Sequence, residues 1–308
     1  MSLRRNLLNL WLRRVEKPAM ARAKTPEKLR DAFEAKARML FHAPRGSRQI
    51  WHRHDHRAGS LDMLDILPQK TTTTTVILYI HGGAFVFGSP RTHAAMIAQL
   101  GHRLGARAVL PRYRLAPESA FPAALEDLGH AWDALLGQGL APHQIVLGGD
   151  SAGGALALAF LGQLCAQKAA MPVGVFCFSP LTDMAHGGES FRTNAQREAV
   201  LPAHRAQELG QMYLNGQDVD DPRVSPIKAD FHGACPVWLT VGDTEILRDD
   251  SRLMAAHLEN AGVSVHFDEK QDLPHVWPIF HNILPEARQS LDDLAVWIRA
   301  LPPPPVES

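Results

Sequence analysis

The sequence contains little cysteine, no net charge and no long apolar run, and each scarcity excludes a class of protein. Its three cysteines, at positions 165, 177 and 235 of 308 residues, lie far apart and form no CxxC pair. This favours reduced core thiols in a cytosolic protein over a disulfide framework. The 32 basic and 32 acidic side chains give a formal net charge of +0, which argues against a nucleic-acid binder. No apolar run reaches the roughly 18 residues that a membrane-spanning helix needs.

What remains is the composition of a folded globular protein, with 45% apolar and 21% charged residues. Its charge is unevenly divided. Residues 1–60 carry 15 Lys and Arg against 5 Asp and Glu, whereas residues 61–308 carry 17 against 27. A basic arm on an acidic body can contact a membrane surface, a partner or the body itself. The N-terminus weakly resembles a signal peptide, but its apolar stretch is short and closes on Arg13 and Arg14. We therefore expect a cytoplasmic protein in which membrane contact is the less favoured of these three roles for the basic arm.

From residue 76 onwards, short apolar runs alternate with longer helical stretches. Strands are expected at 76–80, 106–110, 145–147, 173–178, 237–241 and 263–267, and helices at about 92–104, 121–137, 153–168, 249–261 and 286–300. This alternation predicts an α/β fold in which helices cover both faces of a mostly parallel sheet.

Two segments lie outside that alternation. Residues 3–40 have the apolar spacing of two helices, the first ended by Pro18 and the second capped by Thr25. Residues 185–225 lack a strand pattern and contain a helix candidate at about 202–214, which is typical of a lid or cap near a site.

His52, His54 and His56 alternate as they would on one face of a strand. No cysteine or carboxylate cluster accompanies them, so a solvated strand face is expected in place of a metal site.

The strongest local motif is residues 145–156, Ile-Val-Leu-Gly-Gly-Asp-Ser-Ala-Gly-Gly-Ala-Leu. An apolar strand runs through Gly-Asp-Ser-Ala-Gly directly into an apolar helix, which is the pattern of a nucleophile elbow with Ser151 exposed on the turn. Gly149 and Gly153 suit a turn that brings neighbouring backbone too close for side chains.

A second motif, His-Gly-Gly-Ala at residues 81–84, leaves the strand at 76–80 and turns through two glycines. Such a turn can aim backbone N–H groups at one oxygen, as an oxyanion hole requires. We expect Gly83, Ala84 and Ala152 to donate to the oxyanion, with Gly82 as a further candidate.

Ser151 needs a base, and four histidines follow the candidate acids. His257 falls in a helix, His266 in a strand and His281 in a helical run, whereas His275 follows the last strand. Sites form at the carboxyl ends of strands in open α/β sheets, so His275 is the expected base.

The acid that orients this base is expected in the loop after the strand at 237–241, where both Asp243 and Glu245 lie. Asp249 and Asp250 suit the start of the following helix instead.

Together these motifs resemble the hormone-sensitive-lipase-like family of α/β-hydrolases, the bacterial esterases marked by an HGGG-type motif and GDSAGG. The resemblance covers about residues 60–300 and includes residues 81–84, 113–118, 121–124, 149–154, 179–183 and 275–277. Three positions depart from the family pattern. Ala84 replaces the third glycine but keeps its N–H, and Arg112 stands where Asp is frequent. Aligning Leu-Arg-Asp at residues 247–249 with the family's Asp-Pro-Leu-Arg-Asp places the acid on Glu245, which we favour over Asp243.

The resemblance implies a serine carboxylesterase with the triad Ser151, Glu245 and His275, acting on short- to medium-chain esters through an acyl-enzyme. It implies an α/β-hydrolase fold with a helical cap from residues 1–45 and 185–225. The catalytic domain would be 46–184 and 226–301, and residues 302–308 a disordered tail. The partner would be a small-molecule ester, with no cofactor, no metal and no nucleic acid, and a homodimer is one possible assembly.

Three other functions use the same fold. An amidase or peptidase needs the same triad, a lipase would act at a membrane or lipid surface, and a non-catalytic ligand receptor would bind without turnover. Plant hormone receptors resembling this family lack the catalytic histidine, whereas His275 is present here.

Overall fold

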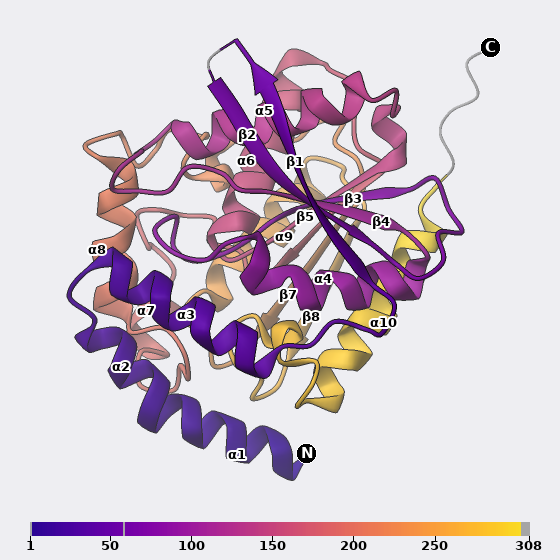
Figure 1. The fold of residues 1–308 in the computed structure, drawn as a ribbon. Helices are drawn as coiled ribbons and strands as arrows, with labels where there is room; N and C mark the ends of the chain where they lie inside the picture. Colours follow the sequence, from indigo (N-terminus) through magenta and orange to yellow (C-terminus); the bar gives the residue numbers. More distant parts are fainter. Residues whose placement is uncertain (1, 58, 303–308) are drawn as a thin grey trace.

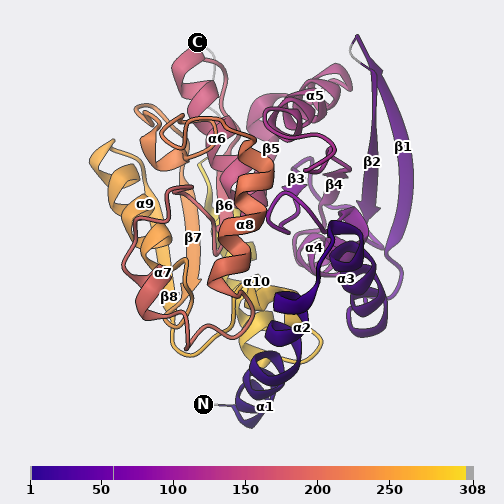
Figure 2. The same cartoon turned by 90° about the vertical axis from the view of Figure 1, so that its left-hand side faces the viewer.

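The computed structural model describes residues 2–57 and 59–302, and within them eight strands form one sheet (Figures 1 and 2). The strands are β1 Arg48–His56, β2 Gly59–Leu67, β3 Val76–Ile80, β4 Arg107–Pro111, β5 Ile145–Asp150, β6 Gly174–Phe178, β7 Val237–Gly242 and β8 Val265–Lys270. Their order is β1-β2-β4-β3-β5-β6-β7-β8. β2 pairs antiparallel with β1 and β4, and the other pairs are parallel. The predicted mostly parallel sheet is confirmed.

Helices cover both faces of this sheet because its central strands are apolar on both sides. Along β3, Ile77 and Tyr79 join one buried cluster, and Val76, Leu78 and Ile80 join the other. The longer helices of the two layers are α4 Pro90–Leu104, α5 Ala123–Gly137, α6 Ala152–Gln167, α9 Arg248–Asn260 and α10 Pro285–Ala300. The cluster containing Ile77 packs α4 and α10 on one face, while the other packs α5, α6 and α9. All five correspond to predicted helices.

The N-terminal helices differ from the prediction at Pro18. The chain is helical through α1 Leu3–Trp11, a π-helical turn at Leu12–Glu16 and α2 Lys17–Arg22. The sequence predicted that Pro18 ends the first helix. This prediction is wrong, because Pro18 lies in the first turn of α2. The π-helical turn directly before it changes the hydrogen-bond register of the helix, which lets the helical run continue past a residue that lacks an N–H. The predicted second helix is α3 Pro26–Leu40, and the Thr25 side chain caps it.

The antiparallel edge of the sheet was only half predicted. β1 contains the three alternating histidines, but its partner β2 was not identified from the sequence. β1 ends at residue 56 and β2 begins at residue 59. The polar residues of β1 remain largely exposed. Within the described residues, no group of three His, Cys, Asp or Glu side chains is arranged to hold a metal ion.

The segment predicted as a lid contains α7 Ser190–Thr193 and α8 Ala203–Leu214. Arg205 of α8 donates a hydrogen bond of 2.8 Å to the carbonyl of Ala23, so α8 lies beside the N-terminal helices, as Figure 2 shows. The remaining short helical turns are Pro142–Gln144, Pro226–Lys228 and Trp277–Phe280. None of the described helices combines the length and apolar character needed to span a bilayer. The predicted disordered tail, apart from residue 302, lies outside the described residues.

Candidate active site

Ser151 lies between the end of β5 and the start of α6, where the sequence places the elbow. Its backbone adopts φ 52° and ψ −120°, a strained conformation for a residue with a side chain. The turn is tight: a Cβ on Gly149 would lie 2.4 Å from the carbonyl oxygen of Gly153, and a Cβ on Gly153 would lie 2.1 Å from that of Ile80. Backbone cannot yield at these distances, so both positions require glycine.

Asp150, immediately before the nucleophile, joins the elbow to the His-Gly-Gly-Ala loop. Its Oδ1 accepts hydrogen bonds from the Tyr79 hydroxyl at 2.7 Å and the Gly82 N–H at 2.9 Å. Its Oδ2 lies 3.2 Å from Nε2 of His93. Burial alone would raise the pKa of Asp150, but His93 and the hydrogen bonds lower it overall. A buried, charged aspartate therefore holds the loop against the elbow.

The hydrogen bond to Asp150 corrects one predicted role. The single N–H of Gly82 already has an acceptor, so Gly82 is left out of the candidate oxyanion hole. The N–H groups of Gly83, Ala84 and Ala152 have no hydrogen-bond partner among the described residues. Gly83 and Ala84 line a cavity together with Ser151. Ala152 begins α6, whose N-terminus adds positive potential beside the serine.

His275 and Glu245 meet beneath the same cavity. The Nδ1–H of His275 donates to Oε2 of Glu245 at 2.6 Å. Oε1 of Glu245 accepts from the Ser179 hydroxyl at 2.8 Å and the Gly242 N–H at 2.6 Å. Both partners of the dyad are buried, Glu245 completely. With Nδ1 protonated, the other ring nitrogen of His275 is free to accept a proton.

The pKa of His275 is raised above its ordinary value. Burial acts to lower that pKa, but the charge and hydrogen bond of Glu245 act more strongly together, aided by Glu198 and Asp150. A raised pKa makes the imidazole a stronger base than free histidine.

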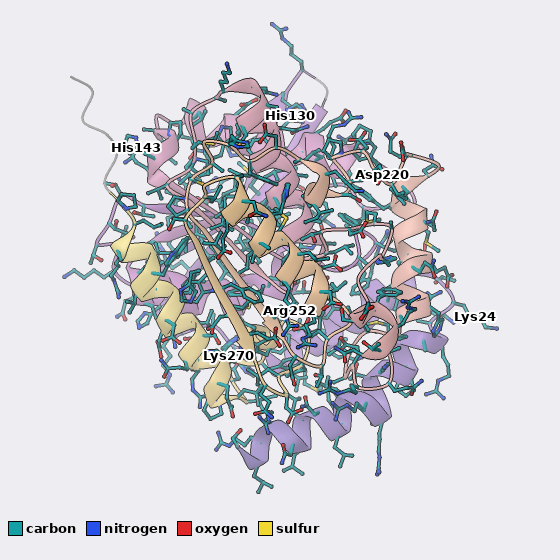
Figure 3. All side chains as sticks on the ribbon, turned by 180° about the vertical axis from the view of Figure 1, so that it is seen from behind. Lys24, His130, His143, Asp220, Arg252 and Lys270 are labelled. Carbon is teal, nitrogen blue, oxygen red and sulfur yellow. The ribbon has the colours of Figure 1, made fainter. Side chains whose placement is uncertain are left out.

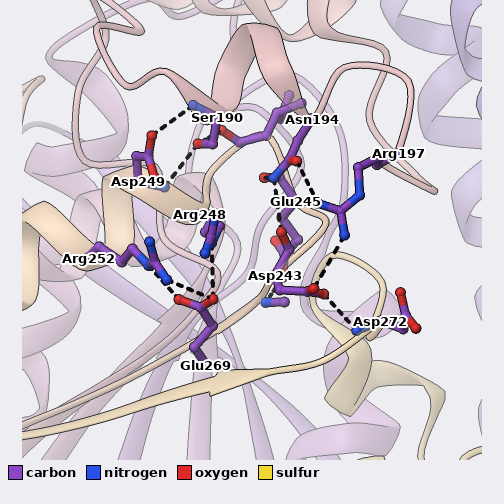
Figure 4. Close-up of polar contacts among 12 residues, drawn as sticks. Ser190, Asn194, Arg197, Asp243, Glu245, Arg248, Asp249, Arg252, Glu269 and Asp272 are labelled. Carbon is purple, nitrogen blue, oxygen red and sulfur yellow. Dashed lines mark hydrogen bonds and ion pairs between the residues drawn. The ribbon is translucent and has the colours of Figure 1, made fainter.

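The side chain of Asp243, the alternative acid, contacts Asp272 and Arg197 (Figure 4). Its Oδ1 accepts the backbone N–H of Asp272 at 2.7 Å, and its Oδ2 lies 3.4 Å from the guanidinium of Arg197. The loop after β7 therefore turns one carboxylate toward His275 and the other toward the surface, which favours Glu245 as the acid.

Glu198 is a site residue that the sequence analysis missed. Its side chain is fully buried, with Oε1 accepting from the Val200 N–H at 2.7 Å and Oε2 from the Ile246 N–H at 3.1 Å. Burial raises the pKa of this carboxyl, although a charged His275 acts in the opposite direction. Glu198 thus holds the residue that follows Glu245. It lies in the segment expected to form a lid, where no motif indicated it.

The cavity over these residues has a volume of about 210 Å³ and a largely apolar wall. Ser151 and His275 lie on it beside the Gly83–Ala84 turn. Its apolar wall is built mainly by the N-terminal helices and by the segment around α8, including Met20, Leu29, Phe33, Leu201, Ala206 and Leu209. Such a site can hold an uncharged molecule with an apolar chain against a nucleophile, a base and backbone donors.

Comparison with known proteins identifies the family to which this fold belongs. Residues 77–279 match a protein-family model described as alpha/beta hydrolase fold. An acetyl-hydrolase of Streptomyces hygroscopicus is 38% identical over 72% of this chain and 75% of its own length. An esterase of Acinetobacter venetianus is 37% identical over 75% of this chain and 77% of its own. The crystal structure of an esterase from the bacterial hormone-sensitive lipase family superposes with a TM-score of 0.89 at 33% identity, covering 98% of this chain and 99% of that one.

Proposed function

This chain belongs to the hormone-sensitive-lipase-like family of α/β-hydrolases and is a carboxylic ester hydrolase, and we propose that Ser151, His275 and Glu245 carry its reaction. His275 removes the proton of Ser151 as the serine oxygen attacks the ester carbonyl. The carbonyl oxygen becomes an oxyanion, which the N–H groups of Gly83, Ala84 and Ala152 stabilise.

In the second half of the first step, His275 gives its proton to the leaving alcohol, and an acyl-enzyme on Ser151 remains. Water then attacks the acyl group with the same residues in reversed roles, which releases the acid and restores the serine. Glu245 keeps the proton on Nδ1 of His275 throughout. The observation that carries this proposal is the 2.6 Å contact between the two buried side chains beside the Ser151 elbow.

For the substrate, we propose an ester with a short to medium acyl chain, bound beneath a cap formed by residues 1–45 and 185–225. The cavity supports this choice, because its volume of about 210 Å³ is modest and its wall is apolar. Activity on p-nitrophenyl esters of increasing acyl length would measure this preference. A rate that rises steadily towards long chains would contradict it.

The direct test is Ser151→Ala, with Ser264→Ala as a matched control because Ser264 is exposed, directly precedes β8 and does not line the cavity. We expect Ser151→Ala to abolish both p-nitrophenyl butyrate hydrolysis and covalent labelling by a fluorophosphonate, while Ser264→Ala retains both. Labelling that survives in Ser151→Ala would show that another residue is the nucleophile.

A further inference from the structure

The outer side of the N-terminal helices carries a row of exposed apolar side chains. This row, called the outer row below, consists of Leu3, Leu7, Leu10, Trp11 and Val15, whose exposed fractions range from 37% to 73%. Their spacing of three, four or one residue places them along one side of the helical arm. Figure 1 shows α1 at the edge of the molecule with its outer side unobstructed.

The outer row is not needed to attach the arm, because the inner side does that. Leu8 and Leu12 are buried in the core. The Asn9 amide donates to the carbonyl of Asp272 at 2.8 Å, and the Arg5 guanidinium donates to the carbonyl of Gln271 at 3.2 Å. A helix anchored in this way would be expected to be polar on its outer side. A continuous exposed apolar row therefore indicates an interaction surface.

The charges around the outer row identify the kind of partner. The exposed charged residues of segment 2–24 are all basic: Arg4, Arg13, Arg14, Arg22 and Lys24. Lys24 extends away from the body in Figure 3. The one acidic residue of this segment, Glu16, is paired with Lys36. Basic residues flanking exposed Leu and Trp are the pattern of a helix that lies in the surface of an anionic membrane. A second copy of the chain would oppose this surface with the same positive charges.

The outer row also reaches the active-site cavity. Trp11 is partly exposed and at the same time lines the cavity that contains Ser151 and His275. A surface that covers the outer row therefore lies next to the cavity wall formed by the N-terminal helices.

We propose that the outer row and the exposed basic residues Arg4 and Arg14 dock this protein on an anionic phospholipid surface. Trp11 then sits where lipid and cavity meet, so that apolar esters dissolved in the bilayer lie close to the site, a consequence that rests on the proposed esterase function. Docking itself needs no catalysis. The positive charge of residues 1–60 left open whether the basic arm contacts a membrane, a partner or the body, and this proposal assigns the contact to a membrane.

The test is co-sedimentation of the full chain with vesicles of phosphatidylcholine alone and of phosphatidylcholine mixed with phosphatidylglycerol. We expect binding to the anionic vesicles, weakened by salt, and little binding to the neutral ones. Leu3→Ser/Leu7→Ser/Leu10→Ser should reduce that binding at least tenfold, and Arg4→Gln/Arg14→Gln should reduce it several-fold. The matched control is Leu253→Ser/Val296→Ser, which removes exposed apolar side chains from α9 and α10.

Hydrolysis of soluble p-nitrophenyl butyrate should be unchanged in the triple serine variant, because its three positions lie outside the cavity wall. Ser151→Ala should bind vesicles like the unmodified chain, so a failure of the esterase proposal would leave the docking result readable. The inference is overturned if the chain binds neither vesicle type, or if the triple variant binds as well as the unmodified chain. It is also overturned if the triple variant only converts a dimer to a monomer, since the outer row would then be an interface between copies.

Discussion

Replacing Glu245 by glutamine keeps the length of the side chain and changes one carboxylate oxygen into an NH₂ group. In the structure the carboxylate accepts three hydrogen bonds: one from His275 at Oε2, and two at Oε1 from Ser179 and the Gly242 N–H. A glutamine offers one oxygen, so it cannot serve both positions. Either His275 or the pair of donors at the other oxygen must lose its acceptor.

The two orientations differ in cost. If the NH₂ faces Ser179 and Gly242, the Gly242 N–H is left opposite another donor in a buried site, at a cost of about 1–3 kcal/mol. If the NH₂ faces His275, the ring can change tautomer and accept at Nδ1, so no hydrogen bond is lost there. The second orientation is therefore favoured. It moves the proton of His275 to Nε2, and the imidazole can no longer act as a base. In the serine-protease triad of the chymotrypsin type, the same exchange of acid for amide lowers kcat by about 10⁴.

We expect Glu245→Gln to lower kcat for p-nitrophenyl butyrate by about 10³–10⁴, with KM changed by only a few-fold and the melting temperature little altered. The control is Asp243→Asn, which removes the charge that faces Arg197 and should change kcat by less than about threefold, since surface ion pairs contribute little. A loss of kcat in Asp243→Asn with activity retained in Glu245→Gln would refute the reasoning and place the acid on Asp243.

Three further predictions concern the surroundings of the triad. The pKa of His275 is raised above the ordinary value of 6.5, and only the neutral form of the imidazole accepts a proton. We therefore expect kcat/KM to fall as the pH drops through a midpoint above 6.5. A midpoint at or below 6.5 would contradict this. Glu198 adds to that raised pKa, so Glu198→Gln should move the midpoint to lower pH, whereas a purely structural role would lower the melting temperature and leave the midpoint in place. Gly153→Ala would place its Cβ 2.1 Å from a backbone oxygen, which should cost about 1–3 kcal/mol or more and lower the melting temperature by several degrees; an unchanged melting temperature would show that the elbow can relax.

Much of the site could be predicted because its signals are local. The elbow needs an apolar strand, two glycines and a helix within a dozen residues, and all of them are contiguous in the sequence around Ser151. His275 could be selected because sites of open α/β sheets lie after the carboxyl ends of strands, so its position after the last strand was informative. The alternation of strands and helices likewise predicted every parallel strand of the sheet.

The antiparallel edge could not be predicted in the same way. β1 is polar and mostly exposed, so its alternating histidines indicated an exposed strand but offered no apolar face from which its length or its partner could be predicted. Its partner β2 begins only two residues after β1 ends. β2 also contains three acidic or hydroxyl side chains, which weaken the pattern of a buried strand.

The sequence by itself determined which residues are the candidates for reaction and where the backbone must turn, because a nucleophile elbow and a glycine-rich turn are made by neighbours in the chain. Only the tertiary structure decided how the polar groups pair. Asp243 and Glu245 lie in one loop and carry the same chemistry, and the packing of distant segments turned them in opposite directions. Gly82 lost its predicted role to Asp150, 68 residues away, and Glu198 reached the loop of Glu245 across 48 residues. A hydrogen bond depends on direction and distance between atoms that folding brings together, and residue type and spacing along the chain do not contain that information.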